Sequence, residues 1–159
     1  MKVAIIMGSD SDWNVMKATF DTLKSFGVEV DLTIASAHRT PQKVHDFVKG
    51  SDAQIFIVAA GMAAHLAGVV ASLTTNPVIG VPINSEPFKG LDSLLSTVQM
   101  PGGVPVATMA VNGAKNAALF AVEILALQDT ALADKLNAYR VEMAAEVDRK
   151  DKIIQQNIF

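Results

Sequence analysis

The sequence has no cysteine, one tryptophan and one tyrosine, and only 18% of its 159 residues are charged. Without cysteine the chain has no disulfide, no thiolate metal ligand and no cysteine nucleophile. The net charge of −3 and the few aromatic rings argue against a nucleic-acid-binding surface. No apolar run reaches the length of a membrane span, and a predicted strand at Val3 leaves no room for a signal peptide. We therefore expect a cytoplasmic protein that binds neither nucleic acid nor membranes.

Hydrophobic residues, in contrast, make up half of the sequence. A chain of this length is expected to form one domain, over residues 1–159, with a proper core. The excess of apolar residues predicts a buried interface between subunits, and hence a homo-oligomer. Two segments are candidates for that interface, the apolar helix predicted at residues 117–127 and the apolar tail at residues 153–159.

Short apolar runs alternate with segments of helical period along the chain. Helices are predicted between the strands, and Asp129 and Thr130 would cap a last, extended helix whose apolar stripe runs to Val147. Repeated strand–helix units predict an α/β fold in which helices wrap a parallel sheet. Five strands are predicted, at residues 3–7, 28–34, 54–59, 78–81 (ended by Pro82) and 106–111.

Polar residues follow the first predicted strand, in the segment Gly8–Trp13. Ser9 and Ser11 offer hydroxyls that can hold a phosphate together with a helix N-terminus, and the Asp12 carboxylate suits a ribose diol. The alternative is a helix N-cap, because Ser and Asp are common capping residues, but a cap explains only one of the four polar residues. The segment contains neither a Walker loop nor a dinucleotide-binding motif.

A second set of donors follows the second predicted strand, in the segment Ser36–Pro41. Arg39 can grip a phosphate through two N–H groups, and Ser36 adds a third donor. The alternative is a surface arginine ahead of a helix that Thr40 caps and Pro41 opens. Taken alone, this loop supports both interpretations equally.

The third predicted strand ends in small residues that lead to a histidine, in the segment Ala59–His65. Small residues let a ligand approach the backbone, and the switch from strand to helix is where open α/β sheets bind ligands. A histidine has an ordinary pKa of roughly 6.5, so it can donate and accept a proton near neutral pH. Three successive loops with donors for an anion are poorly explained by capping alone, so we expect one shared ligand site.

Four ordered segments resemble the PurE family of purine biosynthesis, which includes the N5-carboxyaminoimidazole ribonucleotide mutases. They are Gly8–Trp13, Ser36–Pro41, Ala63–Leu66 and Asp92–Thr108, and the resemblance covers nearly the whole chain. It implies a flavodoxin-like, three-layer α/β/α fold, an octamer, and no metal or cofactor. It also implies a reaction on a small-molecule ribonucleotide, in which a carboxylate moves from the exocyclic nitrogen of an imidazole to a ring carbon.

The resemblance also implies roles for individual residues. His65 matches the catalytic acid/base, which would protonate the carbamate nitrogen and later remove the proton from the ring carbon. Ser9, Asp12 and Arg39 match substrate-binding positions. Further positions that line the same site are matched by Ser11, Ser36, His38, Gly61 and Leu66.

Four features depart from the family pattern. Met62 stands where the family has a second glycine, and Ala67 replaces a common proline. Residues 111–114 and the segment before Gln54 are shorter than in the family. These differences concern loop shape and subunit packing more than the chemistry.

Other functions fit parts of the pattern. The second branch of the PurE family carboxylates the uncarboxylated ribonucleotide with carbon dioxide, but Arg39 and His65 favour the mutase branch. A nucleotide-binding module without catalysis would need the three loops but not His65. A receiver-like signalling domain would need an aspartate at the end of a strand, whereas the third predicted strand ends in alanine and glycine. The three histidines lack the spacing of metal ligands, so no metal is expected.

Overall fold

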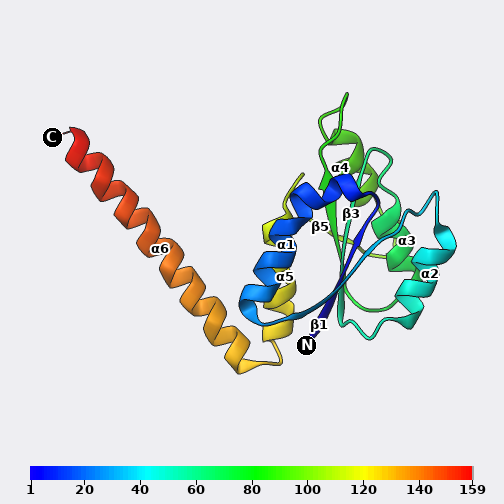
Figure 1. Ribbon diagram of the computed structural model, residues 1–159, viewed down its shortest axis with the longest axis horizontal. Coiled ribbons are helices and arrows are strands. Elements are labelled where there is room, and N and C mark those ends of the chain that lie inside the picture. The colour runs from blue at the N-terminus through cyan, green and yellow to red at the C-terminus, as the bar shows by residue number, and fades with distance from the viewer. Residues whose placement is uncertain (159) are drawn as a thin grey trace. The chain divides into compact units, whose positions relative to one another are not determined.

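The computed structural model describes residues 1–158 and contains one five-stranded parallel sheet (Figure 1). The strand order is β2-β1-β3-β4-β5, so the chain reverses its direction across the sheet between β1 and β3. This is the flavodoxin-like order, and its switch point lies between those two strands. The strands are β1 (Lys2–Met7), β2 (Glu29–Ile34), β3 (Ile55–Gly61), β4 (Val78–Ile83) and β5 (Ala107–Thr108).

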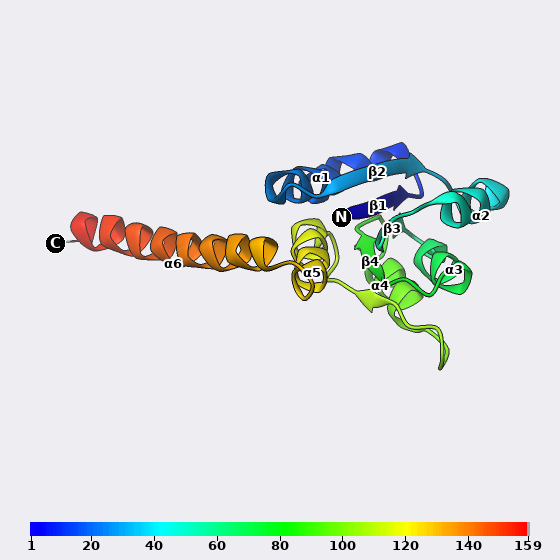
Figure 2. The ribbon, with the colours of Figure 1, turned by 90° about the horizontal axis from the view of Figure 1, so that it is seen from below.

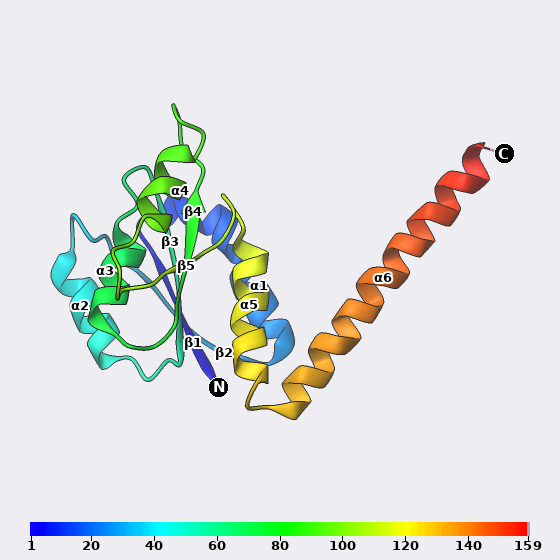
Figure 3. The same ribbon diagram turned by 180° about the vertical axis from the view of Figure 1, so that it is seen from behind.

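Helices cover both faces of the sheet and give the predicted three-layer α/β/α fold. One face carries α1 (Trp13–Phe26) and the start of α5 (Ala114–Ala126), where Thr19 Oγ1 donates a hydrogen bond to the Ala114 carbonyl at 2.8 Å (Figure 3). A short 3₁₀ helix, η1 (Asp10–Asp12), precedes α1. The other face carries α2 (Pro41–Gly50), α3 (Leu66–Leu73) and α4 (Leu91–Val98) (Figure 2).

The central strands are buried on both faces, which explains their continuous apolar sequence. Residues 3–7 of β1 and 55–59 of β3 are almost completely buried, whereas β2 at the edge contains only half-buried and exposed positions. Gly80 of β4 allows α4 to pack closely, because a Cβ at that position would overlap Thr97 Cγ2. The core therefore holds the strand ends in fixed positions relative to one another.

Residues 1–121 form one compact unit and residues 122–159 a second, so α5 begins in the first unit and ends in the second. The second unit contains the extended helix α6 (Thr130–Ile158), which Asp129 caps by accepting a hydrogen bond from the Leu132 amide at 3.0 Å. The predicted stripe on α6 is divided: Leu132 is buried and Val147 is exposed. Phe159, part of the predicted apolar tail, lies outside the described residues.

Several predicted boundaries are wrong in informative ways. The fifth strand has two residues instead of six, because only Ala107 and Thr108 pair with β4. Pro82 does not end β4 but pairs with Ala60 of β3. Proline has no N–H to donate, and Pro82 lies beyond Ile79 and Gly80, the two residues of β4 that pair with the short β5. No helix of the described residues is both long and apolar enough to cross a membrane.

The apolar face of α5 has an explanation within the chain. Ala117, Ala118 and Ala121 are completely buried. These three alanines therefore need no second subunit to cover them, whereas Leu127, at the end of the predicted segment, is 85% exposed. Large apolar side chains are also exposed on α4, at Leu91, Leu95 and Val98, and in the predicted tail, at Ile153, Ile154 and Ile158.

Candidate functional site

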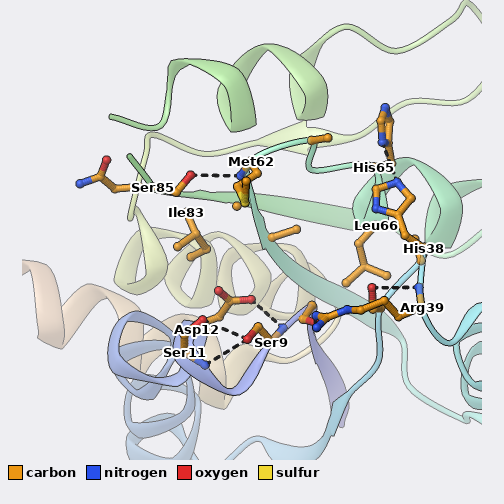
Figure 4. Close-up of a pocket in the computed structure, with 17 residues that line it drawn as sticks. Ser9, Ser11, Asp12, His38, Arg39, Met62, His65, Leu66, Ile83 and Ser85 are labelled. Atoms are coloured by element: carbon orange, nitrogen blue, oxygen red, sulfur yellow. Dashed lines mark hydrogen bonds between the residues drawn. The ribbon is translucent and has the colours of Figure 1, made fainter. Parts of the chain in front are cut away.

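A cavity of about 580 Å³ opens at the carboxyl ends of β1 to β4 (Figure 4). The loops that follow these strands supply its walls, as expected for an open α/β sheet. Every residue that the sequence predicted for the site lines this cavity. These are Ser9, Ser11, Asp12, Ser36, His38, Arg39, Gly61, His65 and Leu66.

The loop after β1 is held in a capping box at the start of η1. Ser9 Oγ accepts a hydrogen bond from the Ser11 amide at 3.4 Å, and Asp12 Oδ2 accepts one from the Ser9 amide at 3.0 Å. Capping thus accounts for two of the polar residues, more than the sequence alone indicated. The serine hydroxyls remain on the cavity wall, where Ser11 Oγ donates to Ser9 Oγ at 3.0 Å.

The Asp12 carboxyl is the buried acid of the site. Its residue is only 5% exposed, and burial raises its pKa above the ordinary value of 3.8. Hydrogen bonds with the Ser9 and Gly8 backbone, and the nearby Arg39 cation, act in the opposite direction and favour the ionised form. A carboxylate held by backbone amides in a poorly hydrated place accepts strong hydrogen bonds from sugar hydroxyls.

Arg39 connects two of the loops. Its Nη2 donates to the Gly8 carbonyl at 2.9 Å, and its own amide donates to Ser36 Oγ at 3.3 Å. Thr40 is the N-cap residue of α2 and Pro41 its first residue, as predicted, but the Thr40 side chain makes no capping hydrogen bond, because its Oγ1 accepts from the Ser36 amide at 2.9 Å. The guanidinium is therefore fixed over the cavity with further N–H groups left for an anion.

Two histidines meet at one side of the cavity (Figure 4). His38 Nε2 and His65 Nδ1 lie 3.0 Å apart, and the ring planes are inclined at 79°. One ring must donate this hydrogen bond to the other, and which one does so depends on the tautomers. Each ring keeps its second nitrogen for another partner. The sequence identified both residues but gave no sign of this contact, since they are 27 positions apart.

The turn between β3 and α3 forms the upper wall in Figure 4. The Met62 amide donates to Ser85 Oγ at 3.2 Å, and the Met62 carbonyl accepts from the Ala64 amide at 2.9 Å. Ile83, Asn84 and Ser85 also line the cavity, although the sequence did not indicate them. A signal was available, because Ile83 is the last residue of β4 and Asn84 and Ser85 follow it, but the prediction that the strand ends at Pro82 concealed this signal.

Comparisons with known proteins identify relatives of this chain. Residues 2–146 match the AIR carboxylase family. A protein from Methanocaldococcus jannaschii named N5-carboxyaminoimidazole ribonucleotide mutase is 51% identical over 154 residues, which cover 97% of this chain and 98% of that protein. A protein of the same name from Pyrococcus horikoshii is 50% identical and covers 97% and 89%, respectively. The crystal structure of Treponema denticola PurE has a TM-score of 0.87 at 32% identity and covers 95% of this chain and 96% of that chain.

Proposed function

The chain belongs to the AIR carboxylase family, and on that premise we propose that it converts N5-carboxyaminoimidazole ribonucleotide to 4-carboxy-5-aminoimidazole ribonucleotide in purine biosynthesis. The names of two relatives with 51% and 50% identity support this activity. The structural observation that supports it most is a single cavity in which an arginine, a buried carboxyl and two paired imidazoles face the same space.

The reaction needs a proton that is given and then recovered. Protonation of the carbamate nitrogen lets the bond between that nitrogen and the carboxyl carbon break, with the electron pair left on nitrogen and carbon dioxide released. The ring carbon then attacks carbon dioxide, forms the new carbon–carbon bond and loses its own proton. No proton is consumed overall, so a group that acts first as acid and then as base is sufficient.

The imidazole pair is suited to this exchange. We assign the acid/base role to His65, as the sequence indicated, and add His38 as the partner with which it shares a proton. The nitrogen and the ring carbon of the substrate occupy different positions. A pair of rings joined by one hydrogen bond offers two outer nitrogens, so it can give a proton at one point and take one at another.

The remaining residues hold the substrate still while carbon dioxide moves. Arg39, with the hydroxyls of Ser9, Ser11 and Ser36, would bind the phosphate, and Asp12 would accept hydrogen bonds from the ribose. Fixing the imidazole in this way keeps the ring carbon within reach of the released carbon dioxide. The small side chains around Gly61, together with Leu66, leave apolar space for that molecule.

Two substrates separate the proposal from its alternatives. The purified protein is given the N-carboxylated ribonucleotide or, separately, the uncarboxylated ribonucleotide with bicarbonate. We expect turnover of the first and not of the second. Turnover only in the second reaction would establish the carboxylase alternative, and a ligand-induced rise in melting temperature without turnover would establish a nucleotide-binding module. A receiver-like domain would show no rise with either ribonucleotide.

We also propose that the protein is a homo-oligomer, an octamer by resemblance. The support lies on α4, a helix that buries two polar side chains and exposes three large apolar ones. Ser93 and Thr97 are buried, whereas Leu91, Leu95 and Val98 are exposed at helical spacing. An apolar stripe on an outer helix face favours cover by another subunit. Light scattering should give a mass well above the 16.8 kDa of one chain, and a stable monomer at micromolar concentration would contradict the proposal.

The remaining expectations from the sequence stay proposals. Residues 1–159 would work as one PurE-like domain in the cytoplasm. The ribonucleotide would be its small-molecule partner, and no metal, cofactor, nucleic acid or membrane would be required. Full turnover in the presence of a chelator, without any added cofactor, is the expected result.

A further inference from the structure

Met62 has an unusual conformation in the cavity wall. Its φ of 55° lies in the left-handed region, which side chains other than glycine and a few small polar residues seldom adopt. The side chain is 62% exposed and lines the cavity. A bulky residue at a position that suits glycine is retained when its side chain has a function that outweighs the unfavourable backbone.

The backbone of Met62 is held by hydrogen bonds, while the residue as a whole is largely exposed. The amide and the carbonyl are held by Ser85 Oγ and the Ala64 amide, respectively. The thioether extends from this anchored point at the edge of the cavity, in the position that Figure 4 labels beside Ser85 and Ile83. Methionine has a flexible, unbranched side chain that adapts its shape to what it covers.

The wall beside Met62 contains the polar Ser85, whose hydroxyl is engaged by the Met62 amide, and several apolar side chains. Ile83 is buried next to Met62, and Ala60 and Ala63 add small side chains to the lining. The polar groups Arg39 and Asp12 belong to the loops after β2 and β1, respectively. The apolar side of the cavity is thus formed by Ile83, Ala60 and Ala63 next to Met62, and these side chains offer contacts suited to carbon dioxide.

We propose that Met62 retains the released carbon dioxide by covering the apolar side of the cavity between the two chemical steps. The inference rests on the proposed mutase activity. It assigns Met62 a positioning role and not a proton transfer. Loss of the side-chain bulk should allow carbon dioxide to escape before the new carbon–carbon bond forms, leaving the uncarboxylated ribonucleotide as a side product.

Three variants separate the effect of the side chain from that of the backbone. Met62→Leu keeps the bulk, Met62→Ala removes it but keeps the unfavourable φ, and Met62→Gly removes the bulk and relieves the backbone. Each is given substrate with a ¹³C-labelled carboxylate, and the ratio of escaped labelled carbon dioxide to labelled product is measured. Affinity for the ribonucleotide is measured in parallel and should stay within twofold of wild type.

We expect the escape ratio to rise at least fivefold in both Met62→Ala and Met62→Gly and to stay within twofold of wild type in Met62→Leu. An unchanged ratio in Met62→Ala would overturn the proposal, and so would a rise confined to Met62→Gly, because the backbone would then be responsible. Failure of the wild-type protein to convert the labelled substrate would instead overturn the mutase assignment. The two failures are therefore distinguishable.

Discussion

The two ends of the parallel sheet use charge differently. At the amino end, Lys2 Nζ lies 2.8 Å from Asp52 Oδ1, 3.2 Å from Glu29 Oε1 and 3.6 Å from Asp31 Oδ2. The hydrogen bonds from Lys2 to Asp52 and Glu29 raise the lysine pKa, and the bond to Lys2 lowers the pKa of Asp52. Lys2 and these carboxylates therefore neutralise one another's charge within the protein.

At the carboxyl end, the charged and titratable groups have mainly neutral partners. Asp12 is held by backbone amides, Arg39 by the Gly8 carbonyl, and His65 by the ring of His38. Such partners orient a side chain without neutralising its charge, so the capacity to bind an ion or transfer a proton remains. The comparison shows that the nature of a group's partners distinguishes a structural charge from one available to a ligand.

The largest effect is expected from breaking the imidazole pair. His65→Asn and His38→Asn should each lower turnover by on the order of a hundredfold to ten-thousandfold, because loss of a general acid/base has that magnitude. Binding of the ribonucleotide should change little in either variant. Steady-state kinetics and direct binding measurements on both variants provide the check.

The two histidine variants also test how the role is divided. If His65→Asn keeps more than half of the wild-type turnover while His38→Asn loses it, the acid/base is His38 and not His65. If both variants keep more than half, the assignment of proton transfer to this pair is wrong.

A smaller effect, on binding, is expected at Arg39 and Asp12. Loss of a charge-assisted contact is expected to weaken binding by about 1.5–3 kcal/mol, or roughly tenfold to more than a hundredfold. Arg39→Ala should weaken binding of the ribonucleotide but not binding of its dephosphorylated form. Asp12→Ala should weaken binding of both ligands. Asp12→Asn serves as a control, because it keeps the shape of the side chain at the capping box. Equal losses for both ligands in Arg39→Ala would contradict a phosphate contact.

The smallest effect is expected at the amino end of the sheet. Lys2→Met should leave turnover unchanged and lower the melting temperature slightly. The folded-state pKa of Asp52 is below its ordinary 3.8, so its pairing stabilises the fold above pH 3.8 and is lost as the pH falls through the folded-state value. The pKa of Lys2 is above its ordinary 10.5, so its contribution is lost only as the pH rises beyond 10.5.

Thermal unfolding of wild type and Lys2→Met across pH tests that expectation. The difference in melting temperature should be constant near neutral pH and shrink below pH 3.8. A large loss of turnover in Lys2→Met would mean that the two ends of the sheet are coupled. It would contradict the distinction between structural charges at the amino end and ligand-binding charges at the carboxyl end.

The sequence was most informative where local chemistry and topology agree. Continuous apolar runs such as residues 55–59 identify strands buried on both faces, and the carboxyl ends of parallel strands necessarily meet. For this reason residues as distant in sequence as Ser9, Arg39 and His65 could be assigned to one site. In the structure all three residues line the same cavity.

Features that depend on contacts between loops could not be predicted. The hydrogen bond between His38 and His65 results from the orientation of two side chains on different loops, and no sequence period encodes it. The capping box of Ser9 and Asp12 required knowledge of where η1 begins. The place of Pro82 inside β4 could not be predicted, because it depends on β5 being too short to pair with that residue.

The most direct test of the mutase assignment follows one carbon atom. Substrate with a ¹³C-labelled carboxylate on nitrogen is converted in a single turnover by the wild-type protein in a large excess of unlabelled bicarbonate. If carbon dioxide passes from nitrogen to carbon within the cavity, the carbon-carboxylated product keeps the label. Product that carries unlabelled carboxylate would show that the carbon comes from solution, and would contradict the account.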